Sequence, residues 1–197
     1  MVPAEGQITP PLPDDDELFE VVLGPDDDSE YCEVIDGIHT EKPPLSVLAS
    51  ILTTYLATMI NSFALPQKLG IAIIGQSLKL DDKNTRRPDV CYIRAERLPP
   101  RAVLWTDPAY FEGGSDLLIE VGHPTTVQET QDRLLRYFSS GVQVVWIVFP
   151  TLQHICVFDS PKSCKILSID DILDGGAVLP GFSLKLAELF NIPQLFA

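Results

Sequence analysis

Residues 116–149 read DLLIEVGHPTTVQETQDRLLRYFSSGVQVVWIVF, two apolar runs separated by a polar segment. The first run, Leu117 to Val121, is nearly continuous, as expected of a strand that is covered on both faces. The second run, Val142 to Phe149, has the same character. Between them a helix is predicted over about 125–139, and Gly141 ends it. This strand–helix–strand unit predicts a right-handed parallel crossover, and therefore a sheet with helices packed on it.

Apolar periodicity and turn residues predict further elements on both sides of this unit. Asp36-Gly37 is typical of a tight hairpin turn, and apolar residues recur at helical spacing from Leu45 onward. The predicted elements are hairpin strands at Tyr31–Val34 and Ile38–Lys42, a helix at Leu45–Phe63 with Ser46 as N-cap, strands at about 70–74, 76–80, 89–93, 153–158 and 164–167, and helices at about 14–23 and 186–190. The fold class is therefore α/β or α+β, with a mixed sheet.

Composition limits the domain organisation and the partners. The chain has 197 residues, of which 45% are hydrophobic, which favours a single globular domain over residues 14–197. Residues 1–13 are rich in proline and are predicted to be poorly ordered. The net charge of −14 disfavours non-specific binding to duplex DNA. We find no apolar run of about 18–20 residues and no signal peptide, which predicts a cytoplasmic location without a membrane partner.

Two carboxylates stand at the ends of apolar strands. Asp89 lies in Arg87-Pro88-Asp89-Val90, and Glu120 lies near the end of the first run quoted above. A carboxylate at the edge of a buried strand costs free energy unless it is paired, hydrogen-bonded or bound to a metal. Two such residues can converge as oxygen ligands for a divalent cation. The alternative is that Asp89 caps a turn and Glu120 forms a salt bridge.

Six short motifs follow one another along the chain. They are Glu33-Val34-Ile35-Asp36-Gly37, Arg87-Pro88-Asp89-Val90, Leu118-Ile119-Glu120-Val121, His123-Pro124-Thr125-Thr126, Tyr137 with Gly141 to Val148, and Leu179-Pro180-Gly181-Phe182. In this order and spacing they resemble the Uma-type putative restriction endonuclease family, a bacterial group within the PD-(D/E)XK nuclease superfamily. The resemblance covers about residues 15–192.

The resemblance implies a restriction endonuclease-like fold, with a mixed central sheet flanked by helices and a hairpin near the N-terminus. It also implies hydrolysis of phosphodiester bonds in DNA with Mg²⁺ or Mn²⁺. By match to the family motifs, the metal ligands are Asp89, Glu120 and the backbone carbonyl of Val121. Glu33 matches an early glutamate that assists catalysis, although a hairpin residue facing solvent is an equal alternative.

The lysine of such nucleases is missing from its usual places. Gly122 stands two residues after Glu120, where these enzymes carry a lysine. In this family the lysine usually lies on the following helix, four residues before Tyr137, and that position is Arg133. Arginine keeps the charge and binds phosphate, but it orients or deprotonates water poorly because its pKa exceeds about 12. Arg133 could equally be an exposed partner of Glu129 at i,i+4 spacing.

Three functional hypotheses follow. The first is a metal-dependent DNA endonuclease with Glu33, Asp89, Glu120 and Arg133 as catalytic residues, low intrinsic sequence specificity and a homodimeric state that suits duplex DNA. The second is a catalytically degenerate member that acts as a binding or regulatory module. It is favoured by Arg133, by the net charge, and by Val144 and Phe149, which replace acidic residues of the family. The third is a protein whose sheet mainly serves self-association.

Overall fold

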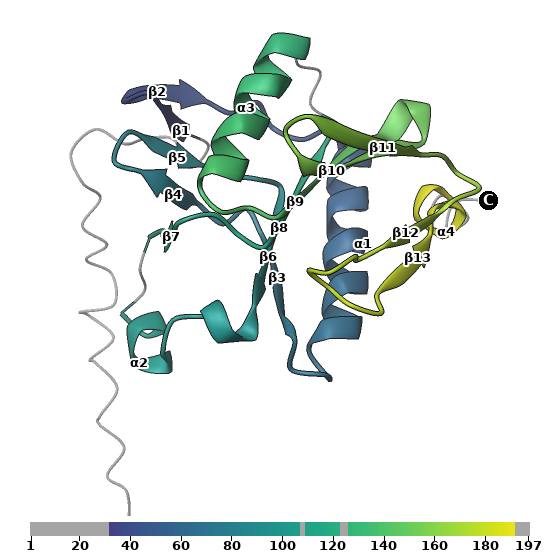
Figure 1. Cartoon of the computed structure of the whole chain (residues 1–197), viewed down its shortest axis with the longest axis horizontal. Helices are drawn as coiled ribbons and strands as arrows, with labels where there is room; N and C mark the ends of the chain where they lie inside the picture. Colours follow the sequence, from purple (N-terminus) through teal and green to yellow (C-terminus); the bar gives the residue numbers. More distant parts are fainter. Residues whose placement is uncertain (1–31, 107–108, 123–125, 192–197) are drawn as a thin grey trace, which may run out of the picture. The chain divides into compact units, whose positions relative to one another are not determined.

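The computed structural model describes residues 32–106, 109–122 and 126–191 (Figure 1). The chain divides into residues 1–30 and residues 31–197, and all described elements lie in the second unit. The expectations for the segment 1–13, the helix at 14–23 and Tyr31 fall outside the described residues. So do those for His123 to Thr125.

A six-stranded sheet forms the centre of the domain. Its strands lie in the order β11, β10, β9, β8, β6, β3. Only β8 and β9 are parallel, with Glu120 opposite Ile147, and this confirms the parallel crossover predicted from the sequence. The other neighbours are antiparallel. The bounds are β3 Gly70–Ile74, β6 Val90–Arg94, β8 Leu117–Val121, β9 Val144–Phe149, β10 His154–Ser160 and β11 Ser163–Leu167.

A second sheet carries the N-terminal hairpin. Its order is β2, β1, β5, β4, β7, with bounds β1 Cys32–Ile35, β2 Ile38–Glu41, β4 Leu78–Asp81, β5 Asn84–Arg86 and β7 Phe111–Glu112. The hairpin and its Asp36-Gly37 turn are confirmed, and both turn residues have positive φ. The sequence did not predict β5, because Asn-Thr-Arg has no apolar alternation. The chain passes from this sheet to the central one between β5 and β6.

Helices cover both faces of the central sheet. Helix α1 (Val47–Ala64) begins at Ser46, whose hydroxyl accepts a hydrogen bond from the Ala49 amide, as predicted. It packs on one face together with β12 (Ile172–Asp174), β13 (Ser183–Lys185) and α4 (Leu186–Phe190). Helix α3 (Val127–Ser139) packs on the opposite face, where it buries Leu134 and Tyr137. Figure 1 shows the sheet between α1 and α3.

Short helical turns occupy two connections. The 3-10 turn Ala95–Arg97 and the short helix α2 (Arg101–Leu104) follow β6. A second 3-10 turn, Pro150–Leu152, links β9 to β10. None of these turns contributes to the site described below.

Helix α1 is long and apolar enough to cross a bilayer by length and composition alone. This corrects the expectation that no stretch of the chain would meet that criterion. In the fold, however, Leu52, Leu56 and Ile60 of α1 are completely or almost completely buried in the core beside the central sheet. A helix whose apolar stripe packs on a sheet behaves as the core helix of a globular domain.

Asn61 of α1 covers the edge strand β3. Its side-chain amide donates to the Ala72 carbonyl at 2.9 Å, and the Ala72 amide donates to Asn61 Oδ1 at 2.8 Å. We expect Asn61→Ala to lower the free energy of unfolding by about 1–3 kcal/mol, because two backbone groups of the edge lose their partners. Urea denaturation measures this, with the exposed neighbour Ser62→Ala as control. Equal stability of the two variants would contradict the assignment.

Candidate active site

Glu120 points from β8 toward α3. Side chains alternate along a strand, so Glu120 lies on the same face as Leu118, which packs in the α3 cluster. Its side chain is 4% exposed and accepts hydrogen bonds from Lys42 Nζ at 3.1 Å, Arg133 Nη1 at 3.0 Å and the Tyr137 hydroxyl at 2.6 Å. Burial alone would raise the pKa of Glu120, but Lys42 and Arg133 outweigh it and hold that pKa below its ordinary value.

Asp89 lies immediately before β6, where the chain enters the central sheet. Its Oδ2 accepts a hydrogen bond from the Val121 amide at 2.6 Å, and its Oδ1 accepts one from Lys42 Nζ at 2.9 Å. Its side chain is 4% exposed. The structure therefore brings together Asp89 and Glu120, the two carboxylates that the family resemblance nominated as metal ligands, and joins Asp89 to the amide of Val121.

Lys42 is the residue that the sequence interpretation missed. It directly follows β2 and precedes Pro43 and Pro44. Its ammonium donates to Asp89, to Glu120 and, at 2.7 Å, to the Arg87 carbonyl, so its three donors all have acceptors. Burial lowers the pKa of Lys42, but Glu120 and Asp89 overcome that effect and raise the pKa above its usual value. The sequence carried no signal for this contact, since a lysine that ends a hairpin strand is usually a surface residue.

The structure also explains why residue 122 is glycine. Gly122 has φ +73°, and a Cβ built there would lie 3.3 Å from the Cβ of Ala49 in α1. A lysine after Glu120 would therefore need strained backbone and would press on the first turn of α1. The usual lysine position on this strand is closed by the packing of α1.

Glu33 is buried and paired, which excludes the alternative of a solvent-facing hairpin residue. Its Oε2 accepts from Arg86 Nη1 at 2.9 Å and its Oε1 accepts from the Arg87 amide at 3.0 Å. The Arg86 and Glu33 side chains are 5% and 4% exposed. Glu33 therefore fixes the segment that leads to Asp89. Within the described part of the chain, Arg86 Nε has no hydrogen-bond partner.

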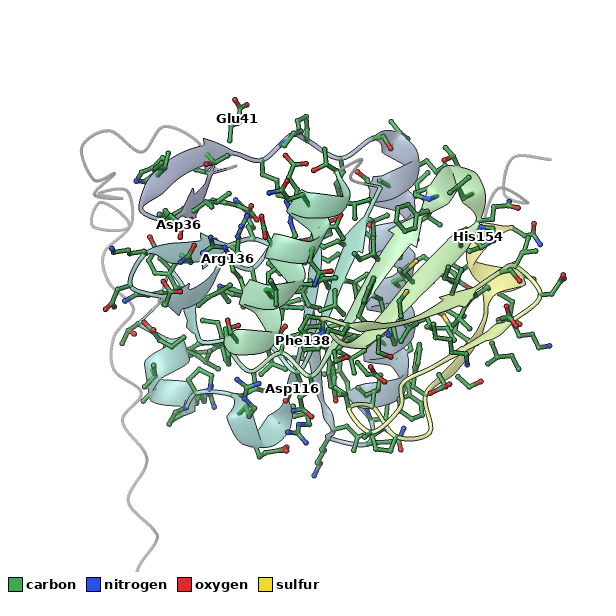
Figure 2. All side chains as sticks on the ribbon, turned by 45° about the horizontal axis from the view of Figure 1, so that its top comes forward. Asp36, Glu41, Asp116, Arg136, Phe138 and His154 are labelled. Atoms are coloured by element: carbon green, nitrogen blue, oxygen red, sulfur yellow. The ribbon has the colours of Figure 1, made fainter. Side chains whose placement is uncertain are left out.

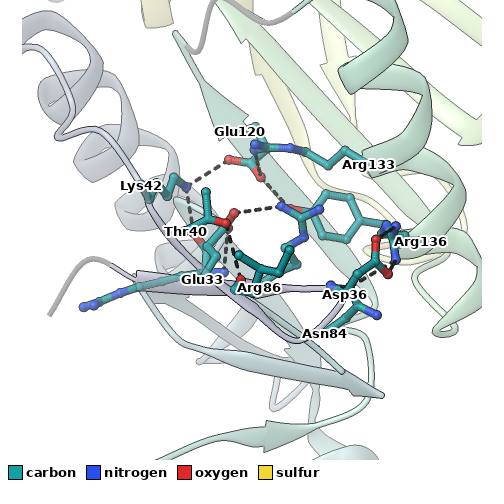
Figure 3. Close-up of polar contacts among 12 residues, drawn as sticks. Glu33, Asp36, Thr40, Lys42, Asn84, Arg86, Glu120, Arg133 and Arg136 are labelled. Carbon is teal, nitrogen blue, oxygen red and sulfur yellow. Dashed lines mark hydrogen bonds and ion pairs between the residues drawn. The ribbon is translucent and has the colours of Figure 1, made fainter. Parts of the chain in front are cut away.

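Arg133 points at the site from α3. Its Nη1 donates to Glu120, while Glu129 is held by Thr126 in a capping box at the start of the helix. The main contact of Arg133 is therefore with Glu120, and the alternative of an exposed pair with Glu129 is wrong. Figure 3 shows Lys42 and Arg133 approaching Glu120 from opposite sides. One turn further, Arg136 ties α3 to the hairpin through two bonds to Asp36 (Figure 2).

These groups form an electrically balanced set. We call it the ion-pair cluster: the three carboxylates and three cations Glu33, Asp89, Glu120, Lys42, Arg86 and Arg133. Burying a charge is costly unless an opposite charge and hydrogen bonds accompany it. The cluster satisfies this condition with its own side chains.

A cleft of about 600 Å³ opens over the ion-pair cluster. The hairpin, the first turn of α1 and one face of α3 bound it. Its lining contains four basic side chains, Lys42, Arg86, Arg133 and Arg136, and five acidic ones, Glu33, Asp36, Glu41, Glu129 and Asp132. A smaller cavity of about 200 Å³ lies beside Asp89 and also has Lys42 in its wall. Lys42 therefore borders two spaces, and its ammonium is the cation between the two carboxylates.

The carboxylates fit a divalent cation of the magnesium type. Asp89 Oδ1 and Glu120 Oε2 both contact one ammonium, at 2.9 and 3.1 Å, so they already converge on a single cationic position. Across residues 32–106, 109–122 and 126–191, no group of three or more Cys, His, Asp or Glu side chains is arranged to hold a metal ion, so the two carboxylates would need further ligands. Mg²⁺ is commonly held by one or two carboxylates, with water and substrate phosphate completing the shell.

Comparisons with known proteins identify the family and the fold. The model of the Uma2 family, described as "Putative restriction endonuclease", matches residues 15–187. The crystal structure of a putative nuclease belonging to DUF820 from Anabaena variabilis superimposes with a TM-score of 0.71. At 19% identity, the alignment covers 81% of this chain and 89% of that one, which shows a shared fold. No match was found among curated proteins.

Proposed function

The chain belongs to the Uma2 putative restriction endonuclease family, and we propose that it is a metal-dependent endonuclease that hydrolyses phosphodiester bonds in DNA. One observation carries the proposal. Asp89 and Glu120, 31 positions apart in sequence, both contact the ammonium of Lys42, and Lys42 itself lines a cleft with arginine side chains in its wall. Buried carboxylates that share a cation in a cleft are typical of functional sites.

Asp89, Glu120 and the carbonyl of Val121 would hold Mg²⁺ or Mn²⁺. The bound ion would supply Lewis-acid polarisation of the scissile phosphate and a more acidic water. The chain's own residues orient this arrangement. Tyr137 fixes the Glu120 carboxylate by its short hydrogen bond, and the Val121 amide fixes Asp89. Arg133 contacts the phosphate, while Glu33 assists by holding Arg86 and the backbone before Asp89.

The proposed substrate is DNA, cut with low intrinsic sequence specificity. The described residues form the two sheets and their covering helices, and no separate recognition domain is found among them. The net charge of −14 opposes non-specific attraction of the phosphate backbone, so contact with DNA depends on the local cations of the cleft. A homodimer would present two such sites to the two strands of a duplex.

A cleavage assay tests the proposal. Supercoiled plasmid and single-stranded DNA are incubated with wild type in Mg²⁺, Mn²⁺ or EDTA, beside Asp89→Asn and the exposed control Asp159→Asn. We expect ion-dependent cleavage by wild type and by the control, and a rate at least about a thousandfold lower for Asp89→Asn, because several kcal/mol of charge stabilisation are lost. Cleavage by Asp89→Asn at the wild-type rate would reject the proposed site.

A binding or regulatory module is the second candidate, and the ion-pair cluster favours it. The cluster is balanced by its own cations, so the fold needs no metal to neutralise the buried carboxylates. On this hypothesis Mg²⁺ leaves the melting temperature unchanged. A ligand that binds the folded state alone must stabilise it, so a clear rise in melting temperature with Mg²⁺ would reject the module.

A further inference from the structure

The cation between the two carboxylates belongs to the protein itself. Lys42 Nζ lies 2.9 Å from Asp89 Oδ1 and 3.1 Å from Glu120 Oε2, and the Lys42 side chain is 10% exposed. A Mg²⁺ ion bound by the same oxygens would lie about 2.1 Å from each of them. Two cations cannot share that gap, so the ammonium and a divalent ion exclude each other from it.

Resting on the proposed function, we propose that Lys42 is the catalytic cation of this site and that its ammonium moves from between Asp89 and Glu120 to the scissile phosphate when a divalent ion binds. Lys42 thus takes the role of the catalytic lysine, which is missing at its two usual positions, 122 and 133, where this chain has glycine and arginine. In the absence of the ion it closes the metal position.

Charge balance within the ion-pair cluster favours this movement. The ion-pair cluster has equal numbers of positive and negative groups. A divalent ion added to it, with Lys42 in place, would leave two positive charges in excess close to one another. Displacement of Lys42 into the cleft separates these charges, and a phosphodiester entering the cleft supplies the negative charge that the displaced ammonium needs.

Lys42 is the cluster cation best able to move. Arg86 and Arg133 are planar forks, each bonded to a glutamate, whereas lysine carries a compact ammonium on a flexible four-carbon stem. The acceptors of Lys42 are the proposed metal ligands and a backbone carbonyl. Lys42 also lines the cleft and the smaller cavity beside Asp89, so its stem has space on both sides.

The test measures ion binding and cleavage separately. Wild type, Lys42→Met, Lys42→Arg and the exposed control Lys165→Met are titrated with Mn²⁺ by electron paramagnetic resonance without DNA, and plasmid cleavage is measured in parallel. We expect Lys42→Met to bind Mn²⁺ at least about tenfold more tightly, because a competing charge is gone. We expect its cleavage rate to fall about a hundredfold or more, as when one charge-stabilising donor is removed.

In Lys42→Met, tighter Mn²⁺ binding together with slower cleavage is expected only if Lys42 both competes with the ion and acts in catalysis. Unchanged or weaker Mn²⁺ binding by Lys42→Met overturns the displacement, and undiminished cleavage overturns the catalytic role. Lys42→Arg keeps the charge and guards against misfolding of the methionine variant, and we expect it to bind Mn²⁺ no more tightly than wild type. Wild type that binds Mn²⁺ but never cleaves rejects the proposed function, and the Mn²⁺ titration then still decides the displacement.

Discussion

Replacing Glu120 by alanine is expected to lower the free energy of unfolding by about 3–5 kcal/mol, the usual cost of removing one partner from a buried ion pair. Glu120 accepts hydrogen bonds from Lys42, Arg133 and Tyr137, and its own side chain is 4% exposed. Without it, two cations face one remaining carboxylate and the Tyr137 hydroxyl has no acceptor. Urea denaturation in EDTA measures the loss, because EDTA removes any contribution from bound metal.

Glu120→Gln is the matched variant. It keeps the size of the side chain and an oxygen acceptor but removes the charge, so we expect a smaller loss than for alanine. Because the pKa of Glu120 is held below 4.5 in the fold, its stabilising effect is present above that pH and is lost as pH falls through the lower folded value. The difference between wild type and Glu120→Ala should therefore shrink in acid. A difference that is constant with pH would show that the charge is unimportant.

Trp146→Ala is expected to lower the free energy of unfolding by about 3–5 kcal/mol as well, through a cavity in the core. Trp146 lies on β9, is 1% exposed, and stacks on Phe182 with ring centroids 6.2 Å apart. Its indole N–H has no hydrogen-bond partner among the described residues. Chemical denaturation at neutral pH measures the change, with the melting temperature as a second readout.

Trp146→Phe separates packing from polarity. Phenylalanine keeps an aromatic ring beside Phe182 and removes the buried indole N–H. A buried donor without a hydrogen-bond partner destabilises the fold by about 1–3 kcal/mol, and this cost is absent in the phenylalanine variant. We therefore expect Trp146→Phe to be clearly more stable than Trp146→Ala. Equal losses for the two variants would mean that the indole is held by an interaction beyond ring packing.

The sequence predicted those parts of the fold that depend on local pattern. The apolar runs of β8 and β9 and the glycine at 141 are local signals, and the strand–helix–strand unit formed as expected. Helix α1 followed its 3.6-residue periodicity from Ser46. The short strand β5 escaped prediction because its three residues are polar and its partners, the strands β1 and β4 and the side chain of Glu33, are set by the tertiary structure.

In the candidate site, too, some residues could be identified from the sequence and others only from the tertiary structure. The sequence by itself singled out Asp89 and Glu120 as the pair of carboxylates, because each stands in a local motif. For Arg133 it left two alternatives, the site or an exposed pair with Glu129, and the structure selected the first. Only the tertiary structure decided which cation lies between the carboxylates. Lys42 meets Asp89 and Glu120 across 47 and 78 positions of sequence. That contact exists because the hairpin lies beside the central sheet, and this leaves no signal in the residues around position 42.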